Sequence, residues 1–474
     1  MPLAKIFFTM VACLIFYLTA FPQVPDTAWL KIYGEVDYVE EGYSVQQTSD
    51  NGYIIVGTSR PIQNYTFDIY LVRTDSNGDT LWTKKYGGDG WDQGFSVLQT
   101  MDDGFMIVGS TSSYGNGEDD VYLIRTDEYG DTIWTKTYGG SGIDIGRSLV
   151  RAYDGGFIVV GQTLSWGHND IYLVRIDNNG DSLWTKFYLP SGFSASASYI
   201  AQTNDSCYVI VGILGYEMWS SKSLLMKVNS EGDSIWTHTY FPNMGSWGSY
   251  VSQTSDDGYI ITNCQYESMP NSNTSFLLKV NSVGDSLWCF RQCIWPSATY
   301  SATESSDNGY VAVGNCWDNL YVYKTDIDGN FLWEDYYDET ELLRGNCIQA
   351  ISDGGYVVTG TTVPDDVFLL KYLPETTGII GSDNDQSFAC ANSQNYPNPF
   401  NASTMIKYEL PQQSLVTIEI YDILGRKVGM LEDRLQPAGY HKLVWHAEDL
   451  PSGVYFYKLR AGDYSETKKM VLMK

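Results

Sequence analysis

Carboxylates and aromatic rings supply most of the side chains in this sequence that could do chemistry. The 474 residues include 57 Asp and Glu, 37 Tyr and 14 Trp, but four His. So few imidazoles argue against His-based metal sites and His-activated nucleophiles. A pair of carboxylates would suit glycoside hydrolysis, but carboxylates are so plentiful that no pair stands out. We therefore predict no catalytic residue and no metal ligand.

Tryptophans that stand outside the repeats described below are the best candidates for ligand contacts. A flat, apolar indole ring stacks on a sugar ring, and neighbouring polar groups then hold its hydroxyls. The candidate ligand-binding residues are Trp91, Asp92, Trp166, His168, Trp219, Trp247, Trp295 and Trp317, with Asp120 and Asp144 beside them. The alternative is that these rings cover sheet edges or plug a channel.

The net charge of −28 limits the kinds of partner. From Asn395 onward there are 10 basic and 9 acidic residues, so the negative charge belongs to the preceding part. An acidic body repels phosphate backbones, and we expect no nucleic-acid partner. Its carboxylates form a solubilising surface or, alternatively, calcium-binding loops. Asp326–Asn330 resembles part of such a loop but occupies a regular hairpin turn, and no cofactor is predicted.

A turn followed by a strand with one Trp recurs along most of the chain. The clearest copies are Asp75–Gly88, Asp127–Gly140 and Asp177–Tyr188. A Gly-rich turn marks the second strand of seven units, but the Trp strand follows six of them. The missing copy, Ala28–Gly34, stands at the N-terminal end. This pattern predicts an all-β fold: a seven-bladed β-propeller over 26–373, closed by its N-terminal strand, with an open solenoid as the alternative.

The alternation of strand direction predicts which residues share a face of this propeller. The first-to-second and third-to-fourth turns lie on one face, here called the turn face. The second-to-third loops and the blade connections lie on the other, the loop face. The connections hold Trp91, Trp247 and Trp295, and the loops hold Trp166, Trp219 and Trp317. Binding residues collect on loops of a rigid scaffold, so the loop face is the predicted binding face.

The spacing Asp-x-x-Gly-x-x-x-Trp at Asp75, Asp127 and Asp177 resembles the tryptophan-docking motif of PQQ-like propellers. That family typically has Asp-x-x-Thr-Gly and eight blades. The resemblance therefore implies similar blade construction, and no quinone site is carried over. The Gly- and Tyr-rich repeats also resemble those of exported proteins from Bacteroidetes-like bacteria.

Both ends of the chain predict export. Residues 1–20 read as a signal peptide, with Lys5 before the apolar stretch Ile6–Leu18, and no other stretch is apolar enough to span a membrane. Residues 374–394 form a polar linker. Residues 395–474 hold about seven short alternating strands, which predicts a small Ig-like β-sandwich.

The C-terminal segment contains short motifs that run in order from Tyr396–Asn401 through Ile420–Arg426, Ala438–Gly439, Trp445 and Ser452–Tyr455 to Lys469–Leu472. In these motifs and their order, the segment resembles the type A sorting domain of the type IX secretion system. The sorting-signal residues are Tyr396, Pro397, Asn398, Pro399, Phe400, Asn401, Gly425, Gly453 and Lys469. The resemblance implies recognition by the type IX translocon and attachment to, or release from, the surface of a Gram-negative, Bacteroidetes-like bacterium. An ordinary sandwich module is the alternative.

Three functions fit these features. The first is a secreted or surface-displayed binding propeller without catalysis, for a glycan or protein ligand. The second is a carbohydrate-active enzyme resembling a glycoside hydrolase, with carboxylates on the loop face. The third is a structural or adhesive surface protein. Eight Cys, one of them in the leader, leave an odd number in the exported chain, so at least one thiol has no intramolecular partner.

Overall fold

A computed structural model describes most of the chain after the leader. The described residues are 24–167, 169–188, 194–215, 221–241, 245–266, 273–291, 297–316, 319–337, 342–363, 365–375, 394–396, 400–410, 414–436, 439–447, 450–461 and 464–473. Secondary structure within these ranges is entirely β, and no helix that could cross a membrane occurs in them. The predicted signal peptide lies outside them. The chain divides into two compact units at Gly378/Ile379, inside the predicted linker.

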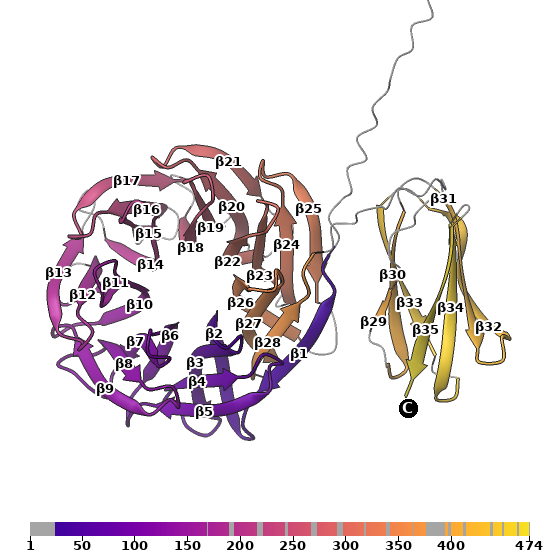
Figure 1. Cartoon of the computed structure of the whole chain (residues 1–474), viewed down its shortest axis with the longest axis horizontal. Helices are drawn as coiled ribbons and strands as arrows, with labels where there is room; N and C mark the ends of the chain where they lie inside the picture. Colours follow the sequence, from indigo (N-terminus) through magenta and orange to yellow (C-terminus); the bar gives the residue numbers. More distant parts are fainter. Residues whose placement is uncertain are drawn as a thin grey trace, which may run out of the picture. The chain divides into compact units, whose positions relative to one another are not determined.

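The first unit contains seven four-stranded antiparallel sheets in its described part, arranged in a ring (Figure 1). In order, the sheets consist of β2 (Tyr38–Gln47), β3 (Tyr53–Pro61), β4 (Asp68–Thr74) and β5 (Thr80–Tyr86); β6 (Asp92–Gln99), β7 (Phe105–Thr111), β8 (Asp120–Thr126) and β9 (Thr132–Tyr138); β10 (Asp144–Arg151), β11 (Phe157–Thr163), β12 (Asp170–Ile176) and β13 (Ser182–Tyr188); β14 (Ala195–Gln202), β15 (Tyr208–Leu214), β16 (Lys222–Val228) and β17 (Ser234–Tyr240); β18 (Ser246–Gln253), β19 (Tyr259–Tyr266), β20 (Asn273–Val280) and β21 (Ser286–Arg291); β22 (Ser297–Glu304), β23 (Tyr310–Cys316), β24 (Asn319–Thr325) and β25 (Phe331–Tyr336); and β26 (Leu342–Ala350), β27 (Tyr356–Val363), β28 (Val367–Tyr372) and β1 (Thr27–Tyr33).

Within each sheet, the two middle strands are the most buried and the outer strand is the most exposed. The two middle strands read as continuous apolar runs, such as β7 and β8, and are buried on both faces. The outer strand β9 alternates between exposed and half-buried side chains. Apolar side chains of neighbouring sheets share cores; Val56 and Leu71 of the first sheet cluster with Ile107 and Ile124 of the second. The propeller-like arrangement of repeated sheets is thus as predicted.

The N-terminal strand completes the last sheet of the ring. β1 pairs antiparallel with β28, from Thr27 opposite Tyr372 to Tyr33 opposite Val367. Tyr33 also belongs to a core cluster that joins residues of the first sheet to residues of the last. The predicted role of Ala28–Gly34 as the displaced outer strand is therefore confirmed. Sheets one and seven are neighbours, as a closed ring requires.

The recurring Trp docks each outer strand on the next sheet. A Cβ on Gly130 would stand 2.9 Å from two ring carbons of Trp82, so the ring lies directly on this glycine. Gly130 has φ +78°, which the third-to-fourth turn needs and which glycine adopts readily. The Tyr86 hydroxyl donates to the Gly130 carbonyl at 2.6 Å, and Lys84 pairs with Asp131 at 2.7 Å. These contacts make the Trp strand a packing device, as its repetition predicted.

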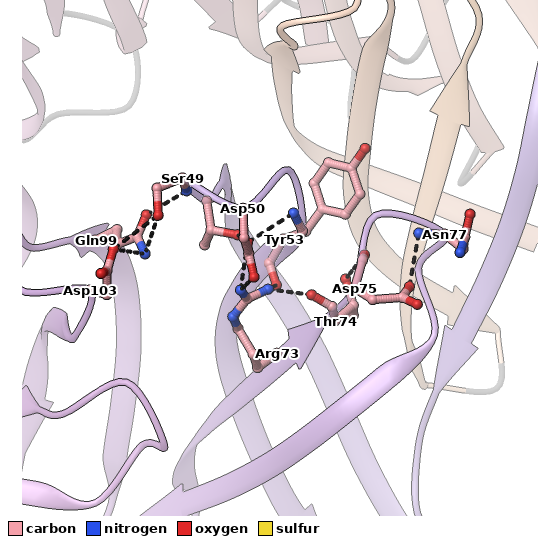
Figure 2. Close-up of polar contacts among 11 residues, drawn as sticks. Ser49, Asp50, Tyr53, Arg73, Thr74, Asp75, Asn77, Gln99 and Asp103 are labelled. Atoms are coloured by element: carbon pink, nitrogen blue, oxygen red, sulfur yellow. Dashed lines mark hydrogen bonds and ion pairs between the residues drawn. The ribbon is translucent and has the colours of Figure 1, made fainter.

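An ion pair repeated in all seven sheets holds the turn face together. Figure 2 shows the first copy, in which the Asp50 carboxylate accepts two bonds from Arg73 at 2.6 and 2.7 Å. Asp50 lies in the first turn and Arg73 near the end of the third strand, so the pair ties the two together. The other copies are Asp102–Arg125, Asp154–Arg175, Asp205–Lys227, Asp256–Lys279, Asp307–Lys324 and Asp353–Lys371. Each cation is nearly buried, and the sequence interpretation missed this pairing.

The second unit is a smaller β domain of two sheets. One sheet has the order β29 (Gln394–Tyr396), β30 (Ser403–Leu410) and β33 (Gly439–His446); the other has the order β32 (Lys427–Gln436), β31 (Ser414–Asp422), β34 (Gly453–Ala461) and β35 (Tyr464–Leu472). Ile406 of the first sheet and Ile418 of the second belong to one core. The alternating pattern therefore predicted this two-sheet domain correctly.

Candidate functional site

A β-bulge in every inner strand turns one side chain toward the centre of the ring. In β10 the pairing with β11 shifts between Gly146 and Ser148, which leaves Arg147 unpaired. The equivalent unpaired residues are Tyr43, Phe95, Ser198, Ser249, Tyr300 and Asn346. We call these seven positions the bulge residues. Bulges often re-aim side chains toward functional sites, because the extra residue leaves the ladder.

The bulge residues all line one cavity of about 610 Å³, here called the channel cavity. Residues from all seven inner strands contribute to its wall. The glycine before the bulge lets neighbouring strands approach; a Cβ on Gly146 would stand 2.6 Å from Val108 of the preceding sheet. The volume falls in the range of about 300–1,000 Å³ typical of small-molecule sites. The scaffold thus presents one variable residue per sheet around a ligand-sized space.

The wall of the channel cavity is uneven in chemistry. Three consecutive bulge residues, Tyr43, Phe95 and Arg147, form a contiguous aromatic and cationic side. The Tyr43 and Phe95 ring centroids lie 5.8 Å apart, and the Arg147 guanidinium carbon lies 4.5 Å from the Phe95 centroid. Ser198 and Ser249 are the small bulge residues, and their side chains take up the least space of the seven. This asymmetry would orient a bound molecule.

Two tyrosines beside the small bulge residues complete the aromatic lining. The rings of Tyr199 and Tyr250 lie 4.4 Å apart between centroids. Burial raises the pKa of Tyr199, and burial together with Cys347 raises the pKa of Tyr250 to about 12. Both hydroxyls therefore stay protonated at neutral pH and serve as hydrogen-bond donors. Rings and hydroxyls in this arrangement favour binding rather than proton transfer.

Arg147 is the charged side chain in the wall of the channel cavity. Burial lowers the pKa of its guanidinium, and the nearby Tyr43 opposes this effect. An arginine nevertheless keeps its charge in proteins. Within the described part of the chain, no carboxylate forms an ion pair with it. The cavity wall contains no Asp, Glu or His, so it offers no acid–base pair of the kind glycoside hydrolysis uses.

The predicted loop-face tryptophans are described for three of six positions. Trp91 and Trp166 are 53% and 51% exposed. Trp91 contacts Phe67 edge-on at 5.7 Å, and Trp166 lies 4.3 Å from Phe187. Trp247 lies in β18 rather than in the connection before it, and is half-buried. Trp219, Trp295, Trp317 and His168 lie outside the described residues.

Asp92 and Asp144, expected beside those rings as sugar contacts, are instead fully buried. The Asp92 carboxylate accepts from the Gly88 amide at 2.8 Å and the Ser113 hydroxyl at 2.6 Å. Asp144 makes the same bonds with the Gly140 amide and the Ser165 hydroxyl. These carboxylates were predicted to face ligand, but they hold the loops from inside.

A second carboxylate lies beside each of these two aspartates. A Cβ on Gly87 would stand 2.1 Å from Asp68 Oδ1 and 2.7 Å from Asp92 Oδ2, so the two groups nearly meet there. Burial and then the charge of Asp92 raise the pKa of Asp68. Burial, with a smaller contribution from Asp144, likewise raises the pKa of Asp120. Since one member of each pair is fully buried, neither pair is open to a sugar substrate.

The described residues contain no cluster of three or more His, Cys, Asp or Glu that could hold a metal ion. At the suspected calcium loop, Asp326 Oδ1 accepts from the amides of Asp328 and Asn330, and Oδ2 accepts from the Asn330 side chain. These are the bonds of a hairpin turn. Calcium binding stays an untested alternative. The cysteines described by the structure, Cys207, Cys264, Cys289, Cys316 and Cys347, are all free thiols.

The sorting-signal residues that are described belong to the framework of the second unit. Phe400 is buried against Trp445 at 5.5 Å and bridges to Leu472 of the last strand. Gly425 has φ +75° in the turn after β31, and Gly453 begins β34 as predicted. Tyr396 lies in β29, Lys469 in β35, and Asn401 is exposed before β30. Pro397, Asn398 and Pro399 lie outside the described residues.

Comparison with known proteins identifies the second unit. Residues 394–473 match the family described as the secretion system C-terminal sorting domain, which confirms the predicted sorting domain. A search of curated proteins found no match. The resemblance of the repeats to PQQ-like propellers stays a prediction.

Several solved structures are similar to the chain at low sequence identity. PorZ, an essential bacterial surface component of the type IX secretion system of Porphyromonas gingivalis, is 12% identical with a TM-score of 0.42; the alignment covers 94% of this chain and 59% of PorZ. A chain in the structure of Drosophila Plexin A in complex with Semaphorin 1b is 9% identical with a TM-score of 0.42; the alignment covers 74% of this chain and 88% of that one. Chaetomium thermophilum Sqt1 is 10% identical with a TM-score of 0.43, covering 68% and 80%.

Proposed function

We propose that this chain is an exported, non-catalytic binding protein whose ligand enters the channel cavity. Its sorting domain directs it through the type IX secretion system to the surface of a Bacteroidetes-type bacterium or into the medium. In this proposal, residues 26–373 are a seven-bladed β-propeller, 374–394 a linker and 395–474 an Ig-like sorting sandwich. The signal peptide at 1–20 takes the chain across the inner membrane.

The observation that carries the proposal is the set of bulge residues. Each of the seven inner strands presents a bulge residue to the cavity, and these residues differ in type around the ring: Tyr, Phe, Arg, Ser and Asn all occur. A scaffold that varies one inward residue per repeat is typical of a recognition site. A glycan or a protein segment would reach the cavity from an open face of the ring.

A binding role fits the wall of the cavity better than catalysis. Rings, hydroxyls and amides can hold a ligand, and the wall has no carboxylate for general acid catalysis. Near the loop face, the Asp92 and Asp144 carboxylates are buried and hold loops. The alternatives of a carbohydrate-active enzyme and of an adhesive surface protein therefore have less support.

The loop face provides a second candidate surface for glycans. Trp91, in a connection between sheets, and Trp166, in a second-to-third loop, each expose about half of their surface. Each ring is braced by a neighbouring Phe, which reduces the entropy lost when a sugar stacks on it. A long glycan would contact these rings, and a short one would bind in the cavity alone.

Two substitutions in the full chain distinguish the surfaces. Ser198→Trp adds a bulky ring at a position that lines the cavity, and Trp166→Ala removes a loop-face ring. We expect a glycan array to retain the wild type on a defined set of glycans, and Ser198→Trp to abolish that retention. Retention lost in Trp166→Ala but unchanged in Ser198→Trp would move the site to the loop face. Ser249→Trp adds a ring at the neighbouring bulge position and replaces Ser198→Trp in the experiment if that variant fails to fold.

A further inference from the structure

We infer that the channel cavity recognises a small ring molecule that bears a carboxylate, which pairs with Arg147. The inference deepens the proposed function, since it takes the cavity as the ligand site and names the chemistry of the ligand. It starts from an anomaly of charge. In a chain of net charge −28, the charged side chain at the cavity wall is a cation.

No protein anion among the described residues satisfies this cation. The seven basic residues of the turn-face pairs each have a carboxylate, as Arg125 has Asp102 and Arg175 has Asp154. Arg147 instead lies over the Phe95 ring, and no carboxylate among the described residues forms an ion pair with it. Glu41 is the acidic side chain next to this part of the wall, but it accepts the hydroxyl hydrogen of Tyr43. A partly buried guanidinium without an anion gains most from one supplied by a ligand.

The position of Arg147 is fixed rather than free to leave the cavity. The bulge removes residue 147 from the strand ladder and turns its side chain inward. Phe95 then supports the guanidinium at 4.5 Å, an arrangement that stabilises the cation without using its five N–H donors. Those donors match the two oxygens of a carboxylate in a bidentate pair.

The rest of the wall fits the body of such a ligand. Tyr43 lies on one side, and the paired rings of Tyr199 and Tyr250 lie on the other, so flat surfaces and hydroxyls surround the space. A six-membered ring, either a sugar or an aromatic ring, would stack on them. Both kinds of ring carboxylate share this chemistry, and the experiment separates them.

The test is a titration of the full chain with two acids and their neutral amides. D-Glucuronate is compared with D-glucuronamide, and 4-hydroxybenzoate with 4-hydroxybenzamide, by isothermal titration calorimetry. Each amide keeps the size and the ring of its acid but lacks the charge. We expect at least one acid to bind about 10- to 100-fold more tightly than its amide, as a charge-assisted hydrogen bond provides.

Three arginine variants locate the source of that preference. Arg147→Gln should bind acid and amide equally, and Arg147→Lys should keep part of the preference because it keeps the charge. Arg151→Gln is the matched control. It removes the same charge from β10, but Arg151 donates to the Gln99 carbonyl outside the cavity wall and should leave the preference unchanged. Equal thermal unfolding of the variants shows that they fold.

The outcomes separate this inference from the proposed function. A preference for glucuronate alone identifies sugar acids, and a preference for 4-hydroxybenzoate alone identifies aromatic acids. Equal affinity for acid and amide, an unchanged preference in Arg147→Gln, or no binding of either acid tighter than about 1 mM overturns the inference. The proposed function fails separately, if Ser198→Trp retains every glycan that the wild type binds.

Discussion

Removing one carboxylate from the repeated turn-face pairs should destabilise the first unit by more than the solvent exposure of that carboxylate suggests. In the fifth copy, Asp256 accepts from Lys279 Nζ at 2.8 and 2.9 Å. The Lys279 side chain is 1% exposed, whereas the Asp256 side chain is 44% exposed. The substitution Asp256→Asn therefore leaves a buried ammonium without its counter-ion.

The expected loss of stability is the sum of two contributions, one from Asp256 and one from Lys279. Burial raises the pKa of Asp256, but bonds from Lys279, Thr254 and the Gly258 amide outweigh it and lower the pKa from 3.8 to about 2. This shift is worth at most about 2.5 kcal/mol, and solvent screening of the exposed carboxylate reduces it to about 1 kcal/mol. Stranding the Lys279 ammonium, with the Val280 carbonyl as its remaining acceptor, adds about 1–2 kcal/mol. We expect a total loss of about 2–3 kcal/mol.

Urea denaturation of Asp256→Asn, followed by tryptophan fluorescence, measures this loss. Asp131→Asn is the matched control, because it removes one negative charge from the Lys84–Asp131 pair, whose side chains are 37% and 70% exposed. That control should cost below about 0.5 kcal/mol. The double substitution of Asp256→Asn with Lys279→Met should recover most of the loss. Equal losses in the two single variants would refute the reasoning.

The sign of the pH dependence is a further part of the same prediction. Because the pKa of Asp256 is lower in the folded chain, the pair stabilises the fold above about pH 4. That contribution is lost as the pH falls from about 4 to about 2. The difference in stability between the wild type and Asp256→Asn should shrink across this window. A difference that stays constant would mean that the charge of Asp256 plays no part.

Two other predictions concern the docking tryptophans and export. Gly130→Ala should destabilise the fold by about 2–4 kcal/mol in urea denaturation, because the added Cβ would overlap the Trp82 ring. Gly155→Ala is the control: this glycine has a similar φ, but the nearest atom to its Cβ would be 3.7 Å away, so the loss should be about 1 kcal/mol. Equal losses in the two variants would exclude ring docking as the cause. Deleting 394–474 should leave the protein in the periplasm of a type IX-competent host, as cell fractionation would show, whereas normal secretion of the truncated chain would contradict the sorting role.

The repeated sheets could be predicted because each is built from local signals. Turns with Gly or Asp and strands with a fixed Trp lie within about 50 residues of one another, and they recur. The displaced copy Ala28–Gly34 also indicated how the ring closes, and β1 pairs with β28 accordingly. Local patterns of this kind predict the repeated sheets without knowledge of contacts between residues far apart in the sequence.

The candidate site was harder to predict because its residues meet only in three dimensions. Asp92 and Asp144 looked like ligand contacts, since they stand beside variable loops, but their side chains turn inward to bind those loops. The bulge residues carry a sequence signal that could have been found: one variable residue between a small residue and a Ser in copies such as Gly42–Ser44, Gly94–Ser96 and Gly146–Ser148. Alternation alone reads this position as outward-facing, because a bulge shifts the register by one residue.

The turn-face ion pairs were missed for a related reason. Asp50 and Arg73 are separated by two strands and a loop, and they meet only when the third strand returns to the first turn. A basic residue near the end of every third strand was visible in the sequence. Its partner could not be chosen from sequence, because each unit contains several aspartates in turns.

The position of a bound ligand tests the central claim most directly. A crystal structure of the full chain soaked with the glycan retained on the array would show where that ligand lies. The account predicts ligand density within the channel cavity, in contact with Tyr43, Arg147 and Ser198. Density against Trp91 or Trp166, with the channel cavity empty, would contradict it.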